Sequence, residues 1–129
     1  MSDTVRPRRT VLLVEDEPDL RELMAEDLTD AGFDVVGADI GEAAIAIIDS
    51  GRPIDVLFTD IRLPGALDGW QIAQHARKVH PDIHVIYASG YSGELSPQVP
   101  NSVYIRKPYL PSAIIAEIRR RLVGTPAPT

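Results

Sequence analysis

The sequence predicts an α/β domain in which a parallel sheet of five strands is covered by helices on both faces. The chain has 129 residues, a length that suits one domain with a sizeable hydrophobic core. Five short runs of apolar and β-branched residues alternate with amphipathic stretches, apart from one gap before the last run. Such alternation is typical of parallel sheets, because the connecting helices bury both faces of the sheet.

The expected strands are short, and turn-forming or polar residues end them. The central run is followed closely by Pro64 and Gly65, which cannot continue a strand. The predicted strands are 10–14, 33–38, 54–60, 83–88 and 103–105.

Start and stop signals place helices between these strands. Pro18 suits the first turn of a helix, where its missing N–H costs nothing, and Gly32 suits the end of that helix. Asp39 and Glu42 form a capping-box pattern for a second helix, which Gly51 closes. The first helix has apolar residues at helical spacing, namely Leu20, Leu23, Met24, Leu28 and Ala31.

Two further helices follow the third and fifth strands. Asp68 can cap a helix over 69–79, which Pro81 ends. The last helix has one apolar stripe, formed by Ile114, Ile115, Ile118 and Leu122. The stretch 90–102 contains several Gly and Pro residues and no helical stripe, so we expect at most a turn there.

Composition excludes several classes of function. The net charge of −6 argues against a nucleic-acid-binding domain, and the lack of cysteine excludes thiol catalysis and cysteine zinc sites. His75, His80 and His84 lack a metal-binding spacing. No apolar run could span a membrane and no signal peptide is evident, so we expect a cytoplasmic protein with polar tails at 1–9 and 124–129.

Polar residues gather where the predicted strands end. Glu15 and Asp16 follow the first strand, Asp60 ends the third, Ser89 follows the fourth, and Lys107 follows the fifth. A parallel sheet brings these ends to one edge, which is where ligands bind in such folds. Three carboxylates at this edge repel one another unless a cation joins them, and their hard oxygen ligands suit Mg²⁺.

These residue types suit phosphoryl transfer. An Asp can act as a nucleophile that forms an aspartyl phosphate, and Lys107 and the Ser89 hydroxyl can bind phosphate oxygens. Each residue alone is also consistent with an ordinary role in a helix cap, a turn or the solvated surface. Their joint placement at the strand ends favours the functional interpretation.

The motifs resemble the receiver domain of bacterial two-component response regulators over roughly residues 10–123. The resemblance rests on Glu15-Asp16, the stretch 59–65 with Asp68-Gly69, Ala88-Ser89 and Lys107-Pro108. It implies a flavodoxin-like (βα)5 fold with strand order 2-1-3-4-5, in which the fourth helix is short or absent.

The resemblance also implies a phosphoacceptor and a metal site. Asp60 would accept a phosphoryl group from a histidine kinase or a histidine phosphotransfer protein. Asp16 and Asp60 would bind Mg²⁺ directly, Glu15 would bind it through water, and the backbone carbonyl of Arg62 would complete the protein ligands. The domain would promote its own phosphorylation and dephosphorylation as a signalling receiver.

The remaining implied roles concern the response to the phosphoryl group. Ser89 and Lys107 would contact it, and Tyr104 would be the aromatic switch residue. The Lys107–Pro108 bond is expected to be cis. Phosphorylation would switch the 90–123 face for a downstream partner, in a monomer or weak dimer that binds neither nucleic acid nor membranes.

Two features set this chain apart from the general pattern of the family. Residues 87–91, Tyr-Ala-Ser-Gly-Tyr, are similar to the Phe-Ala-Thr-Gly-Tyr motif of a subgroup of single-domain receivers with a reduced fourth helix. The chain stops after the last predicted helix, so we expect a stand-alone receiver without an output domain.

Three alternatives remain open at this point. A phosphatase of the haloacid-dehalogenase type also uses an aspartyl nucleophile with Mg²⁺, but its general acid/base would fall at Arg62, which stays protonated. A binding module that keeps only the fold would have lost acids or the lysine, and none is lost here. The chain could also be a receiver excised from a hybrid kinase.

Overall fold

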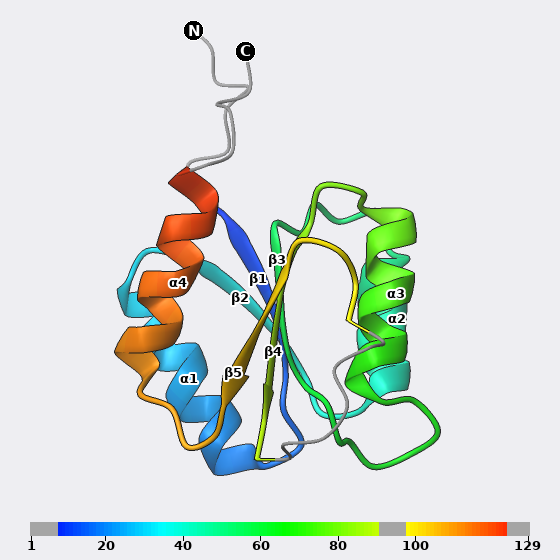
Figure 1. The fold of residues 1–129 in the computed structure, drawn as a ribbon, viewed down its shortest axis with the longest axis horizontal. Helices are drawn as coiled ribbons and strands as arrows, with labels where there is room; N and C mark the ends of the chain where they lie inside the picture. Colours follow the sequence, from blue (N-terminus) through cyan, green and yellow to red (C-terminus); the bar gives the residue numbers. More distant parts are fainter. Residues whose placement is uncertain (1–7, 91–97, 124–129) are drawn as a thin grey trace, which may run out of the picture.

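A five-stranded parallel sheet forms the middle layer of the protein. In the computed structural model, which describes residues 8–90 and 98–123, the strand order is β2-β1-β3-β4-β5 (Figure 1). All four strand pairs are parallel. The strands are β1 (Thr10–Val14), β2 (Asp34–Ala38), β3 (Val56–Asp60), β4 (His84–Ser89) and β5 (Ser102–Arg106). The predicted flavodoxin-like order is therefore confirmed.

Two helices cover each face of this sheet (Figure 1). Helices α1 and α4 lie on one face, and α2 and α3 lie on the other. The helices of the described residues are α1 (Pro18–Asp30), α2 (Gly41–Ile48), α3 (Gly69–Val79) and α4 (Pro111–Val123). Label α4 thus denotes the helix that follows β5.

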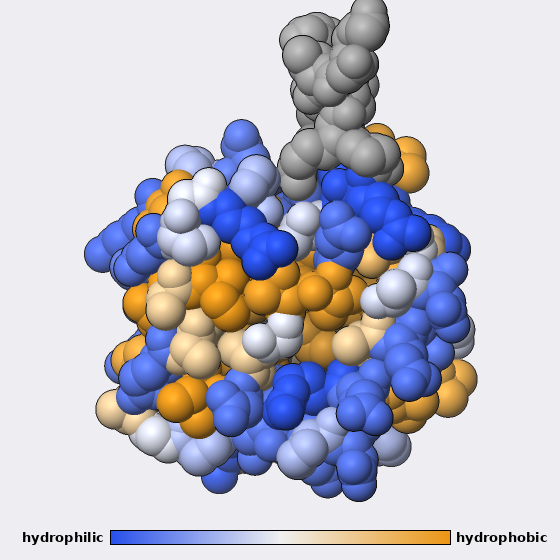
Figure 2. Space-filling model, turned by 180° about the vertical axis from the view of Figure 1, so that it is seen from behind, coloured by the Kyte–Doolittle hydropathy of each residue, from blue (hydrophilic) through white to orange (hydrophobic). Residues whose placement is uncertain are grey.

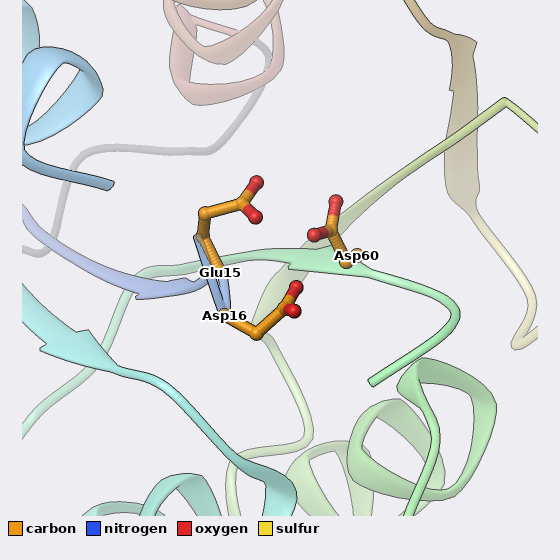
Figure 3. Close-up of side chains that lie close together, drawn as sticks. All are labelled: Glu15, Asp16 and Asp60. Atoms are coloured by element: carbon orange, nitrogen blue, oxygen red, sulfur yellow. The ribbon is translucent and has the colours of Figure 1, made fainter. Parts of the chain in front are cut away.

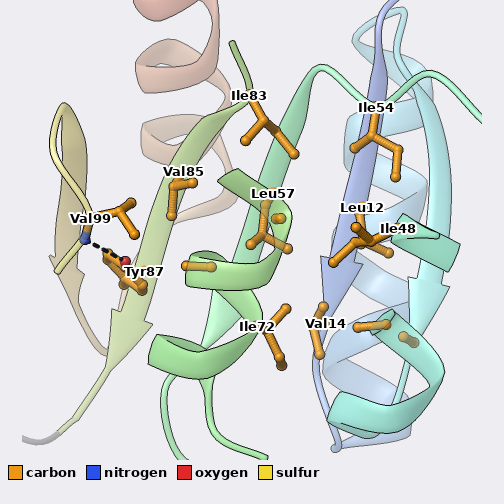
Figure 4. Close-up of a cluster of buried hydrophobic side chains, with 14 of the residues drawn as sticks. Leu12, Val14, Ile48, Ile54, Leu57, Ile72, Ile83, Val85, Tyr87 and Val99 are labelled. Carbon is orange, nitrogen blue, oxygen red and sulfur yellow. Dashed lines mark hydrogen bonds between the residues drawn. The ribbon is translucent and has the colours of Figure 1, made fainter. Parts of the chain in front are cut away.

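The sheet divides the core into two clusters of buried side chains. Alternate residues of a strand point to opposite faces, so neighbouring positions in β1 and β3 enter different clusters. The cluster under α2 and α3 includes Leu12, Val14, Ile48, Leu57, Ile72, Val85 and Tyr87 (Figure 4). The cluster under α1 and α4 includes Val11, Leu13, Met24, Leu28, Phe58, Ile114 and Ile118.

The helix caps agree with the sequence at two helices and differ at one. Pro18 begins α1, and Asp68 caps α3 in a capping box with Gln71, as predicted for both starts. The capping box predicted for Asp39 and Glu42 is wrong.

The structure gives the physical reason for this difference. Helix α2 begins at Gly41 after an extended Ile40, and no side chain caps it. The Glu42 carboxylate instead accepts a hydrogen bond from the backbone N–H of Ala66, at 3.4 Å. Glu42 therefore binds a loop 24 residues further along the chain, although the local sequence pattern predicts that it caps α2.

The expected tails lie mostly outside the described residues, which begin at Arg8 and end at Val123. Arg8 and Arg9 are described, and each forms an ion pair, with Asp34 and Asp55 respectively. Residues 91–97 of the stretch predicted to lack a helix also lie outside the described residues. The described part of that stretch just before β5, 98–101, is coil and turn.

Viewed from behind, the molecule shows a band of apolar side chains at the edge of the sheet, between α1 and α2 (Figure 2). This edge is β2, which pairs only with β1 among the described strands. Its residues Val35 and Val36 are half-buried and pack against opposite core clusters. The apolar band is therefore continuous with the core at this edge.

Tyr87 anchors the segment that leads into β5. The backbone N–H of Val99 donates a hydrogen bond of 3.1 Å to the Tyr87 hydroxyl (Figure 4). Val99 is buried in the cluster under α2 and α3. The Trp70 ring of α3 packs against the Tyr87 ring, with 4.6 Å between the two ring centroids. The hydroxyl that distinguishes Tyr87 from a phenylalanine therefore holds a buried backbone group.

Replacing Tyr87 by Phe is expected to lower the free energy of unfolding by about 1 to 3 kcal/mol, because a buried N–H loses its acceptor. Urea unfolding measures this loss, and hydrogen exchange should show faster exchange of the Val99 amide. Tyr104→Phe is the matched control, since the Tyr104 hydroxyl makes a longer bond of 3.4 Å to the Ser89 carbonyl. Equal losses in the two variants would contradict the anchoring role of Tyr87.

Candidate functional site

Three carboxylates converge at the carboxyl edge of the sheet. Glu15 and Asp16 directly follow β1, and Asp60 is the last residue of β3. One oxygen from each lies within 4.8 Å of the others, and Figure 3 shows the three groups turned toward a common space. Glu15 and Asp60 are buried, whereas Asp16 is exposed. The predicted acidic cluster is thus assembled by the ends of two adjacent strands.

Lys107 offsets part of this negative charge. Its ammonium lies 2.9 Å from Asp60 Oδ1 and 3.6 Å from Glu15 Oε1. Burial lowers the pKa of Lys107, but the hydrogen bond and charge of Asp60, together with Glu15, outweigh burial and raise that pKa. Burial, followed by a hydrogen bond with Asp60, raises the pKa of Glu15 from 4.5 to about 7. The site therefore holds a tightly coupled group of charges.

Backbone contacts fix the end of β3, where Asp60 lies. The N–H of Ile61 donates to the Ala88 carbonyl of β4, and the N–H of Gly69 donates to the Ile61 carbonyl at 2.7 Å. Gly69 approaches so closely that a Cβ atom added to it would lie 2.2 Å from the Asp60 carbonyl oxygen. A side chain at position 69 would therefore displace the strand end or the start of α3.

A cavity of about 390 Å³ opens beside the carboxylates. It is lined by Asp16, Asp60, Arg62, Ala88, Ser89, Gly90 and Lys107. Ser89 is buried, and its carbonyl accepts hydrogen bonds from the Lys107 N–H and, at 3.4 Å, from the Tyr104 hydroxyl. The residues predicted for the site therefore lie together, with Tyr104 one contact away from the cavity.

The Lys107–Pro108 peptide bond is cis, as predicted. The residue that follows it, Tyr109, is one that the sequence did not single out. Its ring packs edge-on against Phe58, and burial, together with the charges of Glu15 and Asp60, raises the pKa of its hydroxyl. The position of Tyr109 directly after the Lys-Pro motif is the feature of the sequence that could have indicated its place near the site.

A flavodoxin-like sheet with converging carboxylates, a lysine and a hydroxyl at its carboxyl edge is the arrangement of a signalling receiver. Residues 11–119 match the family described as the response regulator receiver domain, and the chain belongs to that family. It is thus a phosphoacceptor receiver of two-component signal transduction. Receiver domains bind Mg²⁺ at an acidic pocket and pair with histidine kinases, and this chain has an acidic cluster formed by Glu15, Asp16 and Asp60.

Similar proteins cover nearly the whole domain. The response regulator receiver protein CpdR of Brucella abortus is 28% identical over 120 residues, which are 90% of this chain and 98% of CpdR. A crystal structure of a response regulator receiver protein from Sinorhizobium medicae is 35% identical, with a TM-score of 0.86. That similarity covers 91% of this chain and 96% of the other.

A third similar protein is a kinase that carries a receiver domain. The receiver domain of the hybrid histidine kinase CckA is 29% identical, with a TM-score of 0.76 over 88% of this chain and 98% of that domain. Seven other curated relatives are longer proteins, and the chain spans between 9% and 56% of their length. Within residues 8–90 and 98–123, no helix has the length and apolar character needed to cross a membrane.

The close approach of Gly69 to Asp60 leads to a prediction. Gly69→Ala is expected to lower the free energy of unfolding by about 1 to 3 kcal/mol, because the new methyl group overlaps the strand backbone. Urea unfolding measures the loss. Gly90→Ala is the matched control, since an added Cβ at Gly90 meets no atom of the described residues within 4 Å. Similar stability of the two variants would show that the strand end tolerates the methyl group.

Proposed function

We propose that Asp60 is the phosphoacceptor of this receiver and that Glu15, Asp16 and Asp60 hold Mg²⁺. The observation that carries the proposal is the position of the Asp60 carboxylate. It is buried at a strand end, 2.9 Å from the Lys107 ammonium and within 4.8 Å of two further carboxylates, and it faces an open cavity. Such a carboxylate is accessible to a phosphoryl donor and is surrounded by groups that bind phosphate oxygens or a cation.

The donor set fits Mg²⁺, since it consists of hard carboxylate oxygens. Two oxygens on opposite sides of Mg²⁺ lie at most about 4.2 Å apart, because each Mg–O distance is about 2.1 Å. The upper limit of 4.8 Å in the cluster is close to this value. Asp16 and Asp60 are therefore proposed to bind Mg²⁺ directly, with Glu15 acting through water. The Arg62 carbonyl is proposed as the further protein ligand.

In the proposed transfer, an Asp60 oxygen attacks the phosphorus of a phosphohistidine in line with the leaving nitrogen. The P–O bond forms, the P–N bond breaks, and the released imidazole takes a proton from solvent. The Lys107 ammonium shifts from the Asp60 carboxylate to a phosphoryl oxygen, and the Ser89 hydroxyl donates a hydrogen bond to a second phosphoryl oxygen. When bound, Mg²⁺ neutralises phosphoryl charge. The same groups would promote hydrolysis of the aspartyl phosphate.

The phosphoryl donor is proposed to be a histidine kinase or a histidine phosphotransfer protein. The membership of this chain in the receiver family supports this proposal. The signal is proposed to leave through the 90–123 face. Ser89 joins the site to this face, since its carbonyl accepts from the Tyr104 hydroxyl and from the Lys107 N–H. A movement of Ser89 toward a phosphoryl group would therefore alter its hydrogen bonds to Tyr104 of β5 and to Lys107.

Asp60→Asn is expected to abolish phosphorylation, because the amide keeps the shape of the side chain but removes the nucleophilic charge. Intact-protein mass spectrometry after incubation with Mg²⁺ and acetyl phosphate measures the added phosphoryl group. Asp49→Asn is the matched control, since Asp49 lies at the far end of α2 and pairs with His75. A mass gain in Asp60→Asn at the wild-type rate would disprove the assignment of Asp60 as the phosphoacceptor. If EDTA does not diminish the mass gain of the wild-type protein, the proposed role of Mg²⁺ is disproved.

The switching of the 90–123 face is tested by hydrogen exchange with beryllofluoride as a mimic of the phosphoryl group. Protection is expected to increase across 90–102 when Mg²⁺ and the mimic are bound, since Ser89 is drawn toward the mimic. Ser89→Ala should lose this increase. Unchanged exchange at full occupancy of the mimic would mean that the signal leaves by another face.

A further inference from the structure

Arg21 of α1 holds the backbone next to the acidic cluster. Its Nη1 donates a hydrogen bond of 2.7 Å to the carbonyl oxygen of Glu15. The N–H of Glu15 donates to the Ala38 carbonyl, and its carboxylate accepts from the Glu17 N–H at 3.1 Å. Among these contacts, the one from Arg21 is made to the peptide unit that joins Glu15 to Asp16.

A groove between α1 and β2 accommodates the Arg21 side chain. A Cβ atom added to Gly37 would lie 3.5 Å from Cδ and 3.8 Å from Cγ of Arg21, so the aliphatic part of the side chain passes directly over Gly37. A cavity of about 260 Å³ at this place is lined by Pro18, Arg21, Glu22, Ala25 and Gly37. A methyl group at position 37 would only touch Arg21, but a larger, branched side chain would extend into the space that the Arg21 side chain occupies.

The place of Arg21 in its helix is electrostatically unfavourable. It is the fourth residue of α1, and a positive charge near the N-terminus of a helix is opposed by the helix dipole. The hydrogen bond to Glu15 gives this charge a specific use. Within residues 8–90 and 98–123, no hydrogen bond or ion pair holds the exposed Asp16 carboxylate. The backbone before Asp16 therefore matters, because it sets the direction in which the Asp16 Cβ leaves the chain.

We propose that Arg21 is a positioning residue for the metal site, because it fixes the Glu15–Asp16 peptide unit and so directs Asp16 toward Mg²⁺. This inference rests on the proposed Mg²⁺ site. Partners that orient metal ligands without touching the metal change metal affinity by about 10- to 100-fold. The inference assigns such an effect to a residue that carries the same sign of charge as the ion.

The sign of the effect makes the test sharp. Arg21→Met keeps an apolar side chain in the groove but removes the donor and one positive charge. Electrostatics alone predicts tighter Mg²⁺ binding, since a like charge is removed from the neighbourhood of the cation. Positioning predicts the opposite, a dissociation constant raised by about tenfold or more. Titration of the full chain with Mg²⁺, followed by the NMR amide shifts of Asp16 and Asp60, measures the constant.

Two further variants complete the experiment. Gly37→Val fills the groove and displaces Arg21 with its charge retained, and it is expected to weaken Mg²⁺ binding in the same direction. Arg119→Met is the matched control, because Arg119 also donates to a backbone carbonyl, that of Ala31 at the other end of α1. It removes the same charge and should leave the Mg²⁺ affinity unchanged.

The outcomes separate this inference from the function on which it rests. If wild-type protein binds Mg²⁺ and both Arg21→Met and Gly37→Val bind it equally well or more tightly, the positioning role is disproved and the metal site stands. If the wild-type amides show no saturable shift, the metal site fails and the inference with it. Thermal unfolding of each variant ensures that affinities are compared between folded proteins, and should one variant not fold, the other decides the test.

Discussion

Repulsion between buried carboxylates is the constraint on which the carboxyl edge of this sheet depends. Parallel strands bring Glu15, Asp16 and Asp60 together because their ends share one edge. Without compensation, two of these groups could not remain ionised while buried. Lys107, which directly follows β5, supplies part of the compensation at 2.9 Å from Asp60. Burial first, and then the hydrogen bond and charge of Asp60, raise the pKa of Glu15 to about 7, which favours either a proton or a cation at this place.

Hydrogen bonds and a close contact hold the backbone around the site. Gly69 lies against the Asp60 carbonyl, and the end of β3 is joined by hydrogen bonds to β4 and to the start of α3. The cavity itself remains open beside Arg62 and Gly90, both of which are exposed. A rigid frame around an accessible carboxylate suits transfer between two proteins, because the acceptor must be fixed while the donor comes and goes.

Much of this arrangement is predictable from the sequence, since it follows from local patterns and from topology. The apolar runs locate the strands, and the polar residues that end them locate the site once the sheet is known to be parallel. The differences come from contacts between distant segments. Glu42 serves the loop at Ala66 instead of its own helix, and Leu23 is 51% exposed despite its helical spacing with buried residues. The bond from Val99 to Tyr87 is also unpredictable, because no local pattern specifies which buried hydroxyl a distant N–H will find.

The contact between Trp70 and Tyr87 gives the protein an optical probe of its own. Trp70 is the chain's single tryptophan, and its ring lies 4.6 Å from that of Tyr87, two positions before Ser89 in β4. An indole that is packed against another ring changes its emission when that neighbour shifts or when water reaches it. Ultraviolet fluorescence of the unlabelled chain can therefore follow events at the end of β4 in real time, without a dye or a fused reporter.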